Sequence, residues 1–235
     1  MSLPLDTSIV RADRLDLTFR PMDWAFAENC RAEIDKHFAL LSETRRLWNG
    51  RVMLARNPVM DGSCFRADYF ETDFASFIAW RDWGYPDAEV FNGFGMGAIR
   101  TSDGAFLLGE MDDHTANAGK IYFPAGTPDP SDRLGSVVDL AGSVAREVLE
   151  ETGLAPSDYV AELGWTIARA PGQIGHMRIL QANDNAETLV RRIETWLSNE
   201  DQPELSAIHV VRRTGELPDA VIDIVRTFLM DRLPA

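Results

Sequence analysis

The fold is decided by the stretch Arg146-Glu147-Val148-Leu149-Glu150-Glu151-Thr152-Gly153-Leu154, which places three carboxylates within five residues and then a glycine. At roughly 100° per residue, a helix carries Glu147, Glu150 and Glu151 at about 0°, 300° and 40°, so the three side chains share one arc. Aliphatic residues occupy the neighbouring arc, which predicts a helix that buries one side and directs its carboxylates at a cleft. Gly153 is typical of the left-handed position that ends a helix.

Carboxylates on one helix face repel one another, by roughly a few tenths of a kcal/mol for an exposed pair and by more when they are partly buried. A hard divalent cation such as Mg²⁺ or Mn²⁺ offsets this repulsion, because it prefers carboxylate and water oxygens and keeps positions open for substrate phosphate. The alternative interpretation is a solvated acidic face with Arg146 as its counter-ion. The residues around the helix bear on the choice between the two.

Residues 146 to 154 match the pattern R-E-U-x-E-E-x-G-U, in which U is an aliphatic residue. Upstream, Ile121-Tyr122-Phe123-Pro124-Ala125-Gly126 looks like a strand and a proline-glycine turn. In both features the chain resembles the Nudix hydrolase superfamily, whose box opens with a P-G-G turn; Ala125 replaces one of those glycines. The resemblance covers residues 90 to 235 approximately. It implies an α+β fold, a Nudix α/β/α sandwich with a mixed sheet between helices, plus an N-terminal α+β extension.

The first half of the box departs from the family pattern. The family's spacing places the opening glycine at position 132 and a glutamate at 138, where this chain has Asp132 and Val138. If Gly126 is the opening glycine instead, extra residues lie within Thr127 to Val138. Asp139 is one position off and is expected to cap the helix. Asp129 and Asp132 could replace the missing glutamate, but in a proline-rich loop such residues more often make turns.

Length and composition set outer bounds. The 235 residues suit a core domain with an appendage, which we divide into an extension, residues 1–88, and a Nudix domain, residues 89–235. The aromatic run from Trp80 to Asp87 marks the boundary.

A net charge of −14 argues against a nucleic-acid surface, which needs clustered cations. We expect both cysteines, Cys30 and Cys64, to be reduced. The chain has no apolar run of membrane length and no signal pattern, so a cytoplasmic location and no membrane partner are expected.

Apolar spacing and turn residues predict the other elements. A strand is expected at 15–20, a helix after Asp23, a hairpin from 51–60 and 64–72, and a short helix capped by Asp73. A glycine-spaced strand is expected at 91–100. The rest are strands at 159–169 and 175–181, a helix from 186, a strand at 207–211 and a final helix from about Pro218.

The resemblance implies hydrolysis of a nucleoside diphosphate linked to another group, by attack of water on one phosphorus of the pyrophosphate. It assigns Glu147, Glu150 and Glu151 as ligands of Mg²⁺ or Mn²⁺ and as catalytic residues, together with Arg146. Glu204, just before a late strand, is the first candidate for a remote base, and Asp129 the second. The expected substrate-binding residues are Arg100, Lys120 and Gly126. His114 is expected to be solvated or bonded to backbone, and the aromatic run to pack between the two units or to support a base.

Three functions remain open. A nucleotide sugar such as a UDP-sugar is favoured, because the layout around Ala79-Trp80-Arg81-Asp82 resembles the Nudix branch that hydrolyses these compounds. ADP-ribose or another ADP-linked metabolite is the second. The third is a nucleotide-sensing Nudix domain without turnover. Loss of the first glutamate of the box favours this function, whereas retention of the helix glutamates argues against it. The partner in each case is a small-molecule nucleotide, and the sequence leaves open whether the chain forms a homodimer.

Overall fold

A computed structural model describes residues 9–44 and 47–235 of the chain. The long strand β5 (Val90–Arg100) lies at the centre of its sheet. β5 pairs in parallel with β13 (Gln173–Ala182) along one edge and, at its start, antiparallel with β3 (Arg51–Asp61) along the other. Because side chains alternate across a strand, its two faces meet different layers of the molecule.

The sheet is mixed, with the strand order β1-β12-β13-β5-β3-β4-β2-β10-β9, and β6, β7, β8, β11 and β14 pair beside this path. Two pairs are parallel, β2 with β4 and β5 with β13, and the other pairs of named strands in the described residues are antiparallel. The remaining strands are β1 (Ile9–Ala12), β2 (Arg14–Phe19), β4 (Cys64–Asp73), β6 (Phe106–Met111), β7 (Ile121–Tyr122), β8 (Ala125–Gly126), β9 (Arg133–Leu134), β10 (Val137–Val138), β11 (Tyr159–Ala161), β12 (Trp165–Ala170) and β14 (Leu205–Val211).

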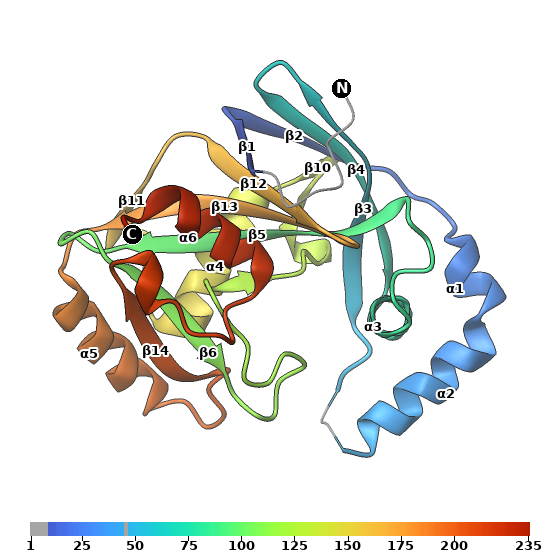
Figure 1. Cartoon of the computed structure of the whole chain (residues 1–235). Coiled ribbons are helices and arrows are strands. Elements are labelled where there is room, and N and C mark those ends of the chain that lie inside the picture. The colour runs from blue at the N-terminus through green and yellow to red at the C-terminus, as the bar shows by residue number, and fades with distance from the viewer. Residues whose placement is uncertain (1–8, 45–46) are drawn as a thin grey trace.

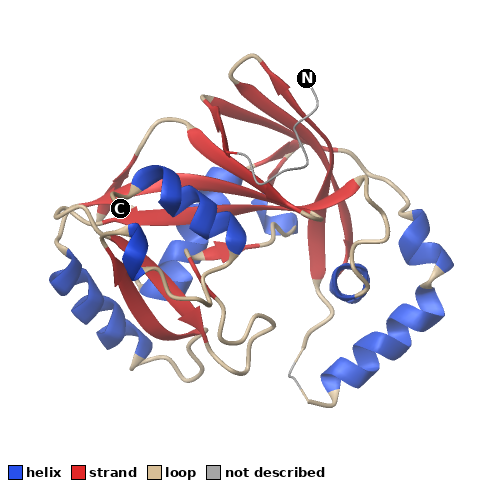
Figure 2. Ribbon diagram, viewed as in Figure 1, coloured by secondary structure: helices blue, strands red, loops and turns tan. Residues whose placement is uncertain are grey.

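Helices cover both faces of the part of the sheet around β5 (Figure 1, Figure 2). On one face, α4 (Leu140–Thr152) and α5 (Ala186–Leu197) bury an apolar cluster with Ile99 of β5. On the other, α6 (Asp223–Arg232) packs against Phe94 and Met96 of the same strand. This layering confirms the expected α+β class with a mixed sheet between helices.

The N-terminal part adds α1 (Ala25–Asn29), α2 (Arg31–Ser42) and α3 (Phe74–Asp82) beside the strands β2 to β4. Its strands join the same sheet, because β1 pairs with β12 and β2 pairs with β10. Trp80 of α3 is fully buried and packs edge-on against Trp24 and Tyr85. The boundary between residues 88 and 89 stays a prediction, and residues 1–8 and 45–46 of the extension lie outside the described residues.

Three of the expected elements differ in detail. The helix expected after Asp23 is two helices, α1 and α2, which meet at Cys30, and the N-cap of α1 is Trp24. The strand expected at 159–169 is split into β11 and β12, with Gly164 between them in the left-handed region at φ +79°. The final helix begins at Asp223 because Ala220 and Ile222 exchange backbone hydrogen bonds with Ile121 of β7 and Ile222 is extended. These interruptions follow from tertiary pairing, which local patterns do not report.

The hairpin of β3 and β4, the cap of α3 by Asp73 and the strand β5 are confirmed, as are the helix from Ala186 and the strand β14. Within residues 9–44 and 47–235, no helix has both the length and the apolar character needed to cross a membrane.

Candidate active site

Helix α4 is held in place at both ends and along its length. The Asp139 carboxylate accepts hydrogen bonds from the backbone N–H groups of Ala141 and Gly142 at 3.2 and 3.0 Å, so the expected cap is confirmed. Gly153 ends the helix in the left-handed region at φ +69°. Gly95 and Gly97 of β5 lie directly beneath the helix, where a Cβ would collide with Val144 and Val148. The close approach of strand and helix fixes where the carboxylates of α4 point.

Glu147 and Glu151 face the short strand β8, which lies in the loop that follows Pro124. Glu151 is only 5% exposed, and its Oε1 accepts a hydrogen bond from the backbone N–H of Ala125 at 3.2 Å. Its Oε2 is buried and has no hydrogen-bond partner in the described part of the chain. Gly126 lies on the carboxyl group of Glu147, which would overlap any Cβ at that position. The two carboxylates are therefore enclosed between the helix and the backbone of this loop.

Enclosure changes the proton affinity of both groups. Burial raises the pKa of the Glu147 carboxyl from 4.5 to about 7, against the lowering effect of the nearby Arg146 guanidinium. Burial also raises the pKa of Glu151 well above its ordinary value, and the negative charges of Glu147 and Glu204 add to the effect. Carboxyl groups shifted in this way by burial and by mutual repulsion are typical of functional sites.

Arg146 is the cation of this cluster. Its Nη1 lies 2.8 Å from Glu147 Oε1 and 3.2 Å from Glu150 Oε2, and its Nη2 lies 3.1 Å from Asp132 Oδ2. The Glu150 side chain is 58% exposed, so it stands on the outer side of the helix while Glu147 and Glu151 face the loop. The counter-ion interpretation therefore holds for the carboxylates that Arg146 contacts, but it does not account for Glu151.

Asp132, which the sequence offered with Asp129 as a replacement for the missing glutamate, supplies a further carboxylate to this cluster. Its side chain is 4% exposed and lies in the short 3₁₀ helix η1 (Pro130–Asp132), where it also accepts a hydrogen bond from the backbone N–H of Asp129 at 3.1 Å. Asp132 stands six positions after Gly126, the distance that separates glycine and glutamate in the family pattern. Counting forward from Gly126, instead of backward from Arg146, favours Asp132 over Asp129.

The extra residues lie after Asp132. They form the hairpin of β9 and β10, and Val137 of β10 pairs with Thr18 of β2. Asp129 caps η1 through a bond from the backbone N–H of Ser131 at 2.6 Å, so its expected role as a turn residue is confirmed.

The potential ligands at this site are carboxylate oxygens, which suit a divalent cation. Across residues 9–44 and 47–235 no three His, Cys, Asp or Glu side chains converge as a ready set of ligands. Glu147 and Glu150 point at Arg146, and Glu151 points one oxygen at Ala125. The unpartnered, buried Oε2 of Glu151 and the carboxylate character of its neighbours match the oxygen ligands that Mg²⁺ and Mn²⁺ prefer.

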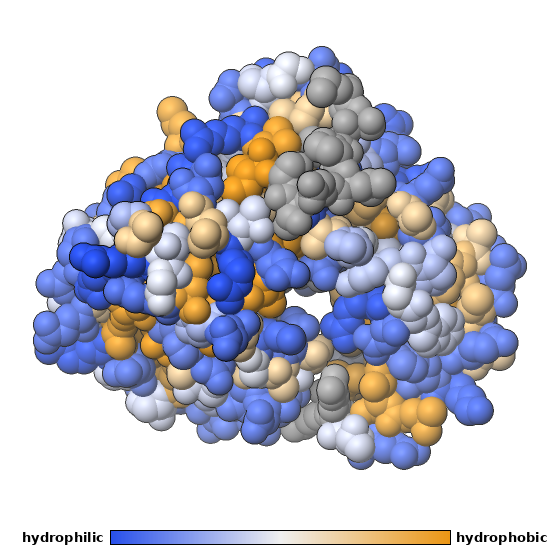
Figure 3. Space-filling view, in the orientation of Figure 1, coloured by the Kyte–Doolittle hydropathy of each residue, from blue (hydrophilic) through white to orange (hydrophobic). Residues whose placement is uncertain are grey.

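The loop of β8 also forms part of the wall of a cleft of about 770 Å³. Figure 3 shows a hollow between the part of the molecule that carries α3 and the part that carries α6. Three of the sequence-predicted residues line this cleft, namely Lys120, Gly126 and Glu204. The carboxylates of α4 do not line the cleft themselves, but the glycine loop that contacts Glu147 and Glu151 does, together with Lys120 and Glu204.

Two other residues lie elsewhere. Arg100 is exposed at the end of β5, outside the cleft lining, and its carbonyl accepts a bond from Gln181. His114 is exposed, and its Nδ1 lies 2.7 Å from Asp112 Oδ1, as expected of a loop histidine outside a site.

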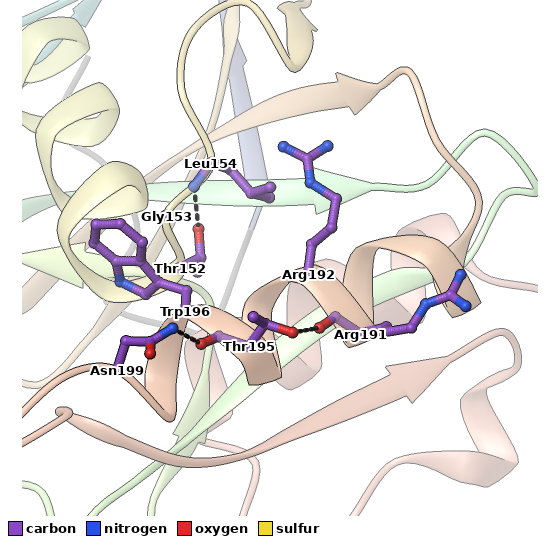
Figure 4. A pocket seen from close by; sticks show the side chains of 8 residues that line it. All are labelled: Thr152, Gly153, Leu154, Arg191, Arg192, Thr195, Trp196 and Asn199. Atoms are coloured by element: carbon purple, nitrogen blue, oxygen red, sulfur yellow. Dashed lines mark hydrogen bonds between the residues drawn. The ribbon is translucent and has the colours of Figure 1, made fainter.

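A second cavity, of about 440 Å³, lies between the end of α4 and α5 (Figure 4). Trp196 packs over Gly153 there, and its indole N–H donates to the carbonyl of Glu150 at 3.2 Å. The candidate site residues of the sequence do not line this cavity, so substrate is expected in the larger cleft.

No protein-family model and no curated protein matches the chain. Among solved structures, the chain is similar to the Nudix hydrolase RenU from M. smegmatis, with 12% identity, 60% of this chain and 85% of that chain covered, and a TM-score of 0.41. It is also similar to the MutT protein of Methanosarcina mazei Go1, with 19% identity, 60% and 91% covered, and a TM-score of 0.40. A Nudix hydrolase from Nitrosomonas europaea has 16% identity, 61% and 74% covered, and a TM-score of 0.35. Similarity at this level does not define activity, so function is argued from the chain's own residues.

Proposed function

We propose that the chain is a Nudix-type hydrolase that cleaves the pyrophosphate bond of a nucleoside diphosphate derivative with Mg²⁺ or Mn²⁺, and that its substrate is a nucleotide sugar such as a UDP-sugar. One observation carries the proposal. Two buried carboxylates with raised pKa values, Glu147 and Glu151, lie beneath the backbone of Ala125 and Gly126, and that backbone lines the large cleft.

The chemistry requires neutralisation of phosphoryl oxygens and a source of hydroxide. A bound divalent cation supplies both by attracting the oxygens and acidifying water. Within the chain, Glu147 has a pKa of about 7, which suits a group that accepts a proton near neutral pH. Asp132 and Arg146 hold the Glu147 carboxylate in one orientation, and Lys120 adds a positive charge at the cleft for phosphate.

Glu204 is proposed as a second proton acceptor. It lines the cleft, and its charge raises the pKa of both Glu147 and Glu151, which means that its carboxylate lies within electrostatic reach of the pair. The backbone carbonyl of Glu204 accepts a bond from the N–H of Asp112, and this bond ties the residue to the start of the 111–119 loop.

The substrate assignment rests on the N-terminal extension. Arg81 of α3 lines the cleft, whereas its neighbour Trp80 is buried in the extension's own core. The stretch that resembles UDP-sugar hydrolases therefore presents one cation to substrate and uses its tryptophan for packing.

A nucleotide-sensing domain without turnover is the second candidate. The observation in its favour is that Arg146 already neutralises Glu147 and Glu150, which would reduce their availability to a cation.

A substrate panel tests the proposal. Purified protein is incubated with Mg²⁺ and UDP-glucose, ADP-ribose, other ADP-linked compounds and nucleoside triphosphates. Hydrolysis of a nucleotide sugar yields two phosphate monoesters, so inorganic phosphate is expected only after alkaline phosphatase is added. The Glu151→Gln variant is the matched control and is expected to lose at least about 100-fold in turnover.

Each alternative has its own signature in this panel. Preference for ADP-ribose would retain the hydrolase and replace the substrate assignment. Tight nucleotide binding without phosphate release from UDP-glucose, ADP-ribose or the other ADP-linked compounds, with or without phosphatase, would support the sensor and overturn hydrolysis.

A further inference from the structure

Two amide side chains lie next to each other inside the large cleft. Gln173 of β13 and Asn92 of β5 are direct partners in the parallel pairing of these strands, so their side chains leave the same face of the sheet. Both residues line the cleft. They come from segments about eighty positions apart in the chain, and neither belongs to the carboxylate cluster on α4.

Each amide is oriented by one hydrogen bond and leaves its other end free. The Oγ1 hydroxyl of Thr127 donates to Asn92 Oδ1 at 3.2 Å, and Gln173 Nε2 donates to the Tyr85 hydroxyl at 2.8 Å. Asn92 Nδ2 and Gln173 Oε1 have no hydrogen-bond partner from the described residues. The cleft therefore carries one N–H donor group and one carbonyl acceptor side by side.

Apolar side chains stand around this pair. Phe77 and Ile78 of α3 line the cleft from the N-terminal extension, and Phe94 and Met96 line it from β5. A pocket with apolar walls and a few placed polar groups suits a flat ring that is hydrogen-bonded along one edge. A sugar, which carries hydroxyl groups all round, would leave many of them unpaired against these walls.

The amide pair lies at a definite distance from the carboxylates. Gly126, which rests on Glu147, pairs with Gly95 of β5. Asn92 precedes Gly95 by three residues, which is about 10 Å along a strand. Thr127 connects the two places, because it follows Gly126 in the chain and bonds to Asn92. A nucleotide can therefore reach from the amides to the loop above Glu147.

We propose that Asn92 and Gln173 form a nucleobase subsite in which Asn92 donates to, and Gln173 accepts from, adjacent groups on the hydrogen-bonding edge of the base. The ring lies between the apolar side chains of α3 and those of β5, and the phosphates extend toward Gly126. This assignment rests on the proposed function for the identity of the ligand as a nucleotide.

Binding without turnover tests the subsite separately from hydrolysis. The dissociation constants of UMP, AMP and ribose 5-phosphate are measured by titration calorimetry for the wild type, Asn92→Leu and Gln173→Met. Both substitutions preserve size approximately and add no charge. Gln181→Met and Asn183→Leu are matched controls near the other end of β13, where these amides bond to backbone carbonyls outside the cleft. Thermal melts confirm that all variants are folded.

The expected result is that Asn92→Leu and Gln173→Met each weaken at least one of the two nucleotides about tenfold or more, while ribose 5-phosphate and both control variants are unchanged. Equal weakening of ribose 5-phosphate, or no weakening of either nucleotide, overturns the subsite. A wild type that binds both nucleotides no more tightly than ribose 5-phosphate also overturns it. The subsite stands if binding behaves as expected and no substrate is hydrolysed, in which case only the proposed hydrolase activity fails.

Discussion

Replacing Glu147 by glutamine is expected to stabilise the metal-free protein at alkaline pH. The Glu147 side chain is 14% exposed, and burial raises its pKa to about 7 from 4.5. Glutamine has the shape of the protonated acid and does not ionise. The substitution therefore removes the cost of holding a charge in this enclosed position.

The sign and size follow from proton linkage. Between pH 4.5 and about 7 the Glu147 carboxyl keeps in the folded chain a proton that it has lost in the unfolded chain, so its contribution to the free energy of unfolding falls as pH rises through this interval and is flat above it. Each pH unit of the interval changes the free energy of unfolding by about 1.4 kcal/mol. At pH 8 the wild type has therefore lost about 3 kcal/mol of stability through this group. Glu147→Gln should be more stable than the wild type by this order at pH 8, and the difference should shrink toward pH 5.

Urea unfolding in the presence of EDTA, followed by circular dichroism at pH 5 and pH 8, measures both differences. Glu150→Gln is the matched control, because Glu150 is on the same helix, contacts the same Arg146 and is mostly exposed. The reasoning is refuted if Glu147→Gln is no more stable than the wild type at pH 8, or if Glu150→Gln gains as much.

Four further outcomes are expected. Asp132→Asn should lower the free energy of unfolding by about 1–2 kcal/mol, since it weakens the pair with the partly exposed Arg146; an unchanged urea midpoint would contradict this. Burial lowers the pKa of His176 to about 4 from 6.5, so the free energy of unfolding of the wild type should fall by about 3 kcal/mol between pH 6.5 and pH 4. The fall should be measurably smaller for His176→Phe. Removing the charge in Glu204→Gln should lower the pKa of Glu147 and move the acidic limb of the pH–rate profile to lower pH, whereas Asp129→Asn should not. Limited proteolysis should not release a stable fragment beginning near residue 88, because β1 and β2 pair with β12 and β10.

Helix α4 could be predicted because its determinants are local. The spacing of its carboxylates, the capping residue Asp139 and the terminal Gly153 lie within fifteen consecutive positions, and each has one dominant effect on a helix. The same holds for Asp73 at the start of α3. The glycine-spaced pattern of residues 91–100 predicted β5, although it did not show that α4 rests on Gly95 and Gly97.

The sequence did not single out Asp132 from Asp129 as the replacement for the missing glutamate, because the pairing of Asp132 with Arg146 is set by long-range structure. The family pattern specifies only the number of residues between its glutamate and its arginine, and the hairpin of β9 and β10 lengthens this interval. The hairpin folds outward because β10 pairs with β2, a strand from the far end of the chain. The sequence does not show that pairing, and an aspartate shortly after a proline is typical of a turn. Asp132 does serve that role in η1 as well. The amides in the cleft were missed for a similar reason, since only the register of β13 with β5 places them together.

The charges around α4 do not balance, and this imbalance is the physical argument for a cation. Arg146 contacts the carboxylates of Glu147, Glu150 and Asp132, so one positive charge serves three negative ones. Among the described residues, Glu151 has the N–H of Ala125 as its hydrogen-bond donor, and its Oε2 has no partner. A protein can relieve such repulsion by protonating the buried groups, which the raised pKa values of Glu147 and Glu151 indicate, or by binding a cation. Protonation alone would keep Glu151 neutral and leave Glu147 only partly ionised near pH 7. A divalent cation would restore the carboxylates to their charged form, and its binding should therefore release protons in proportion to the groups that it deprotonates.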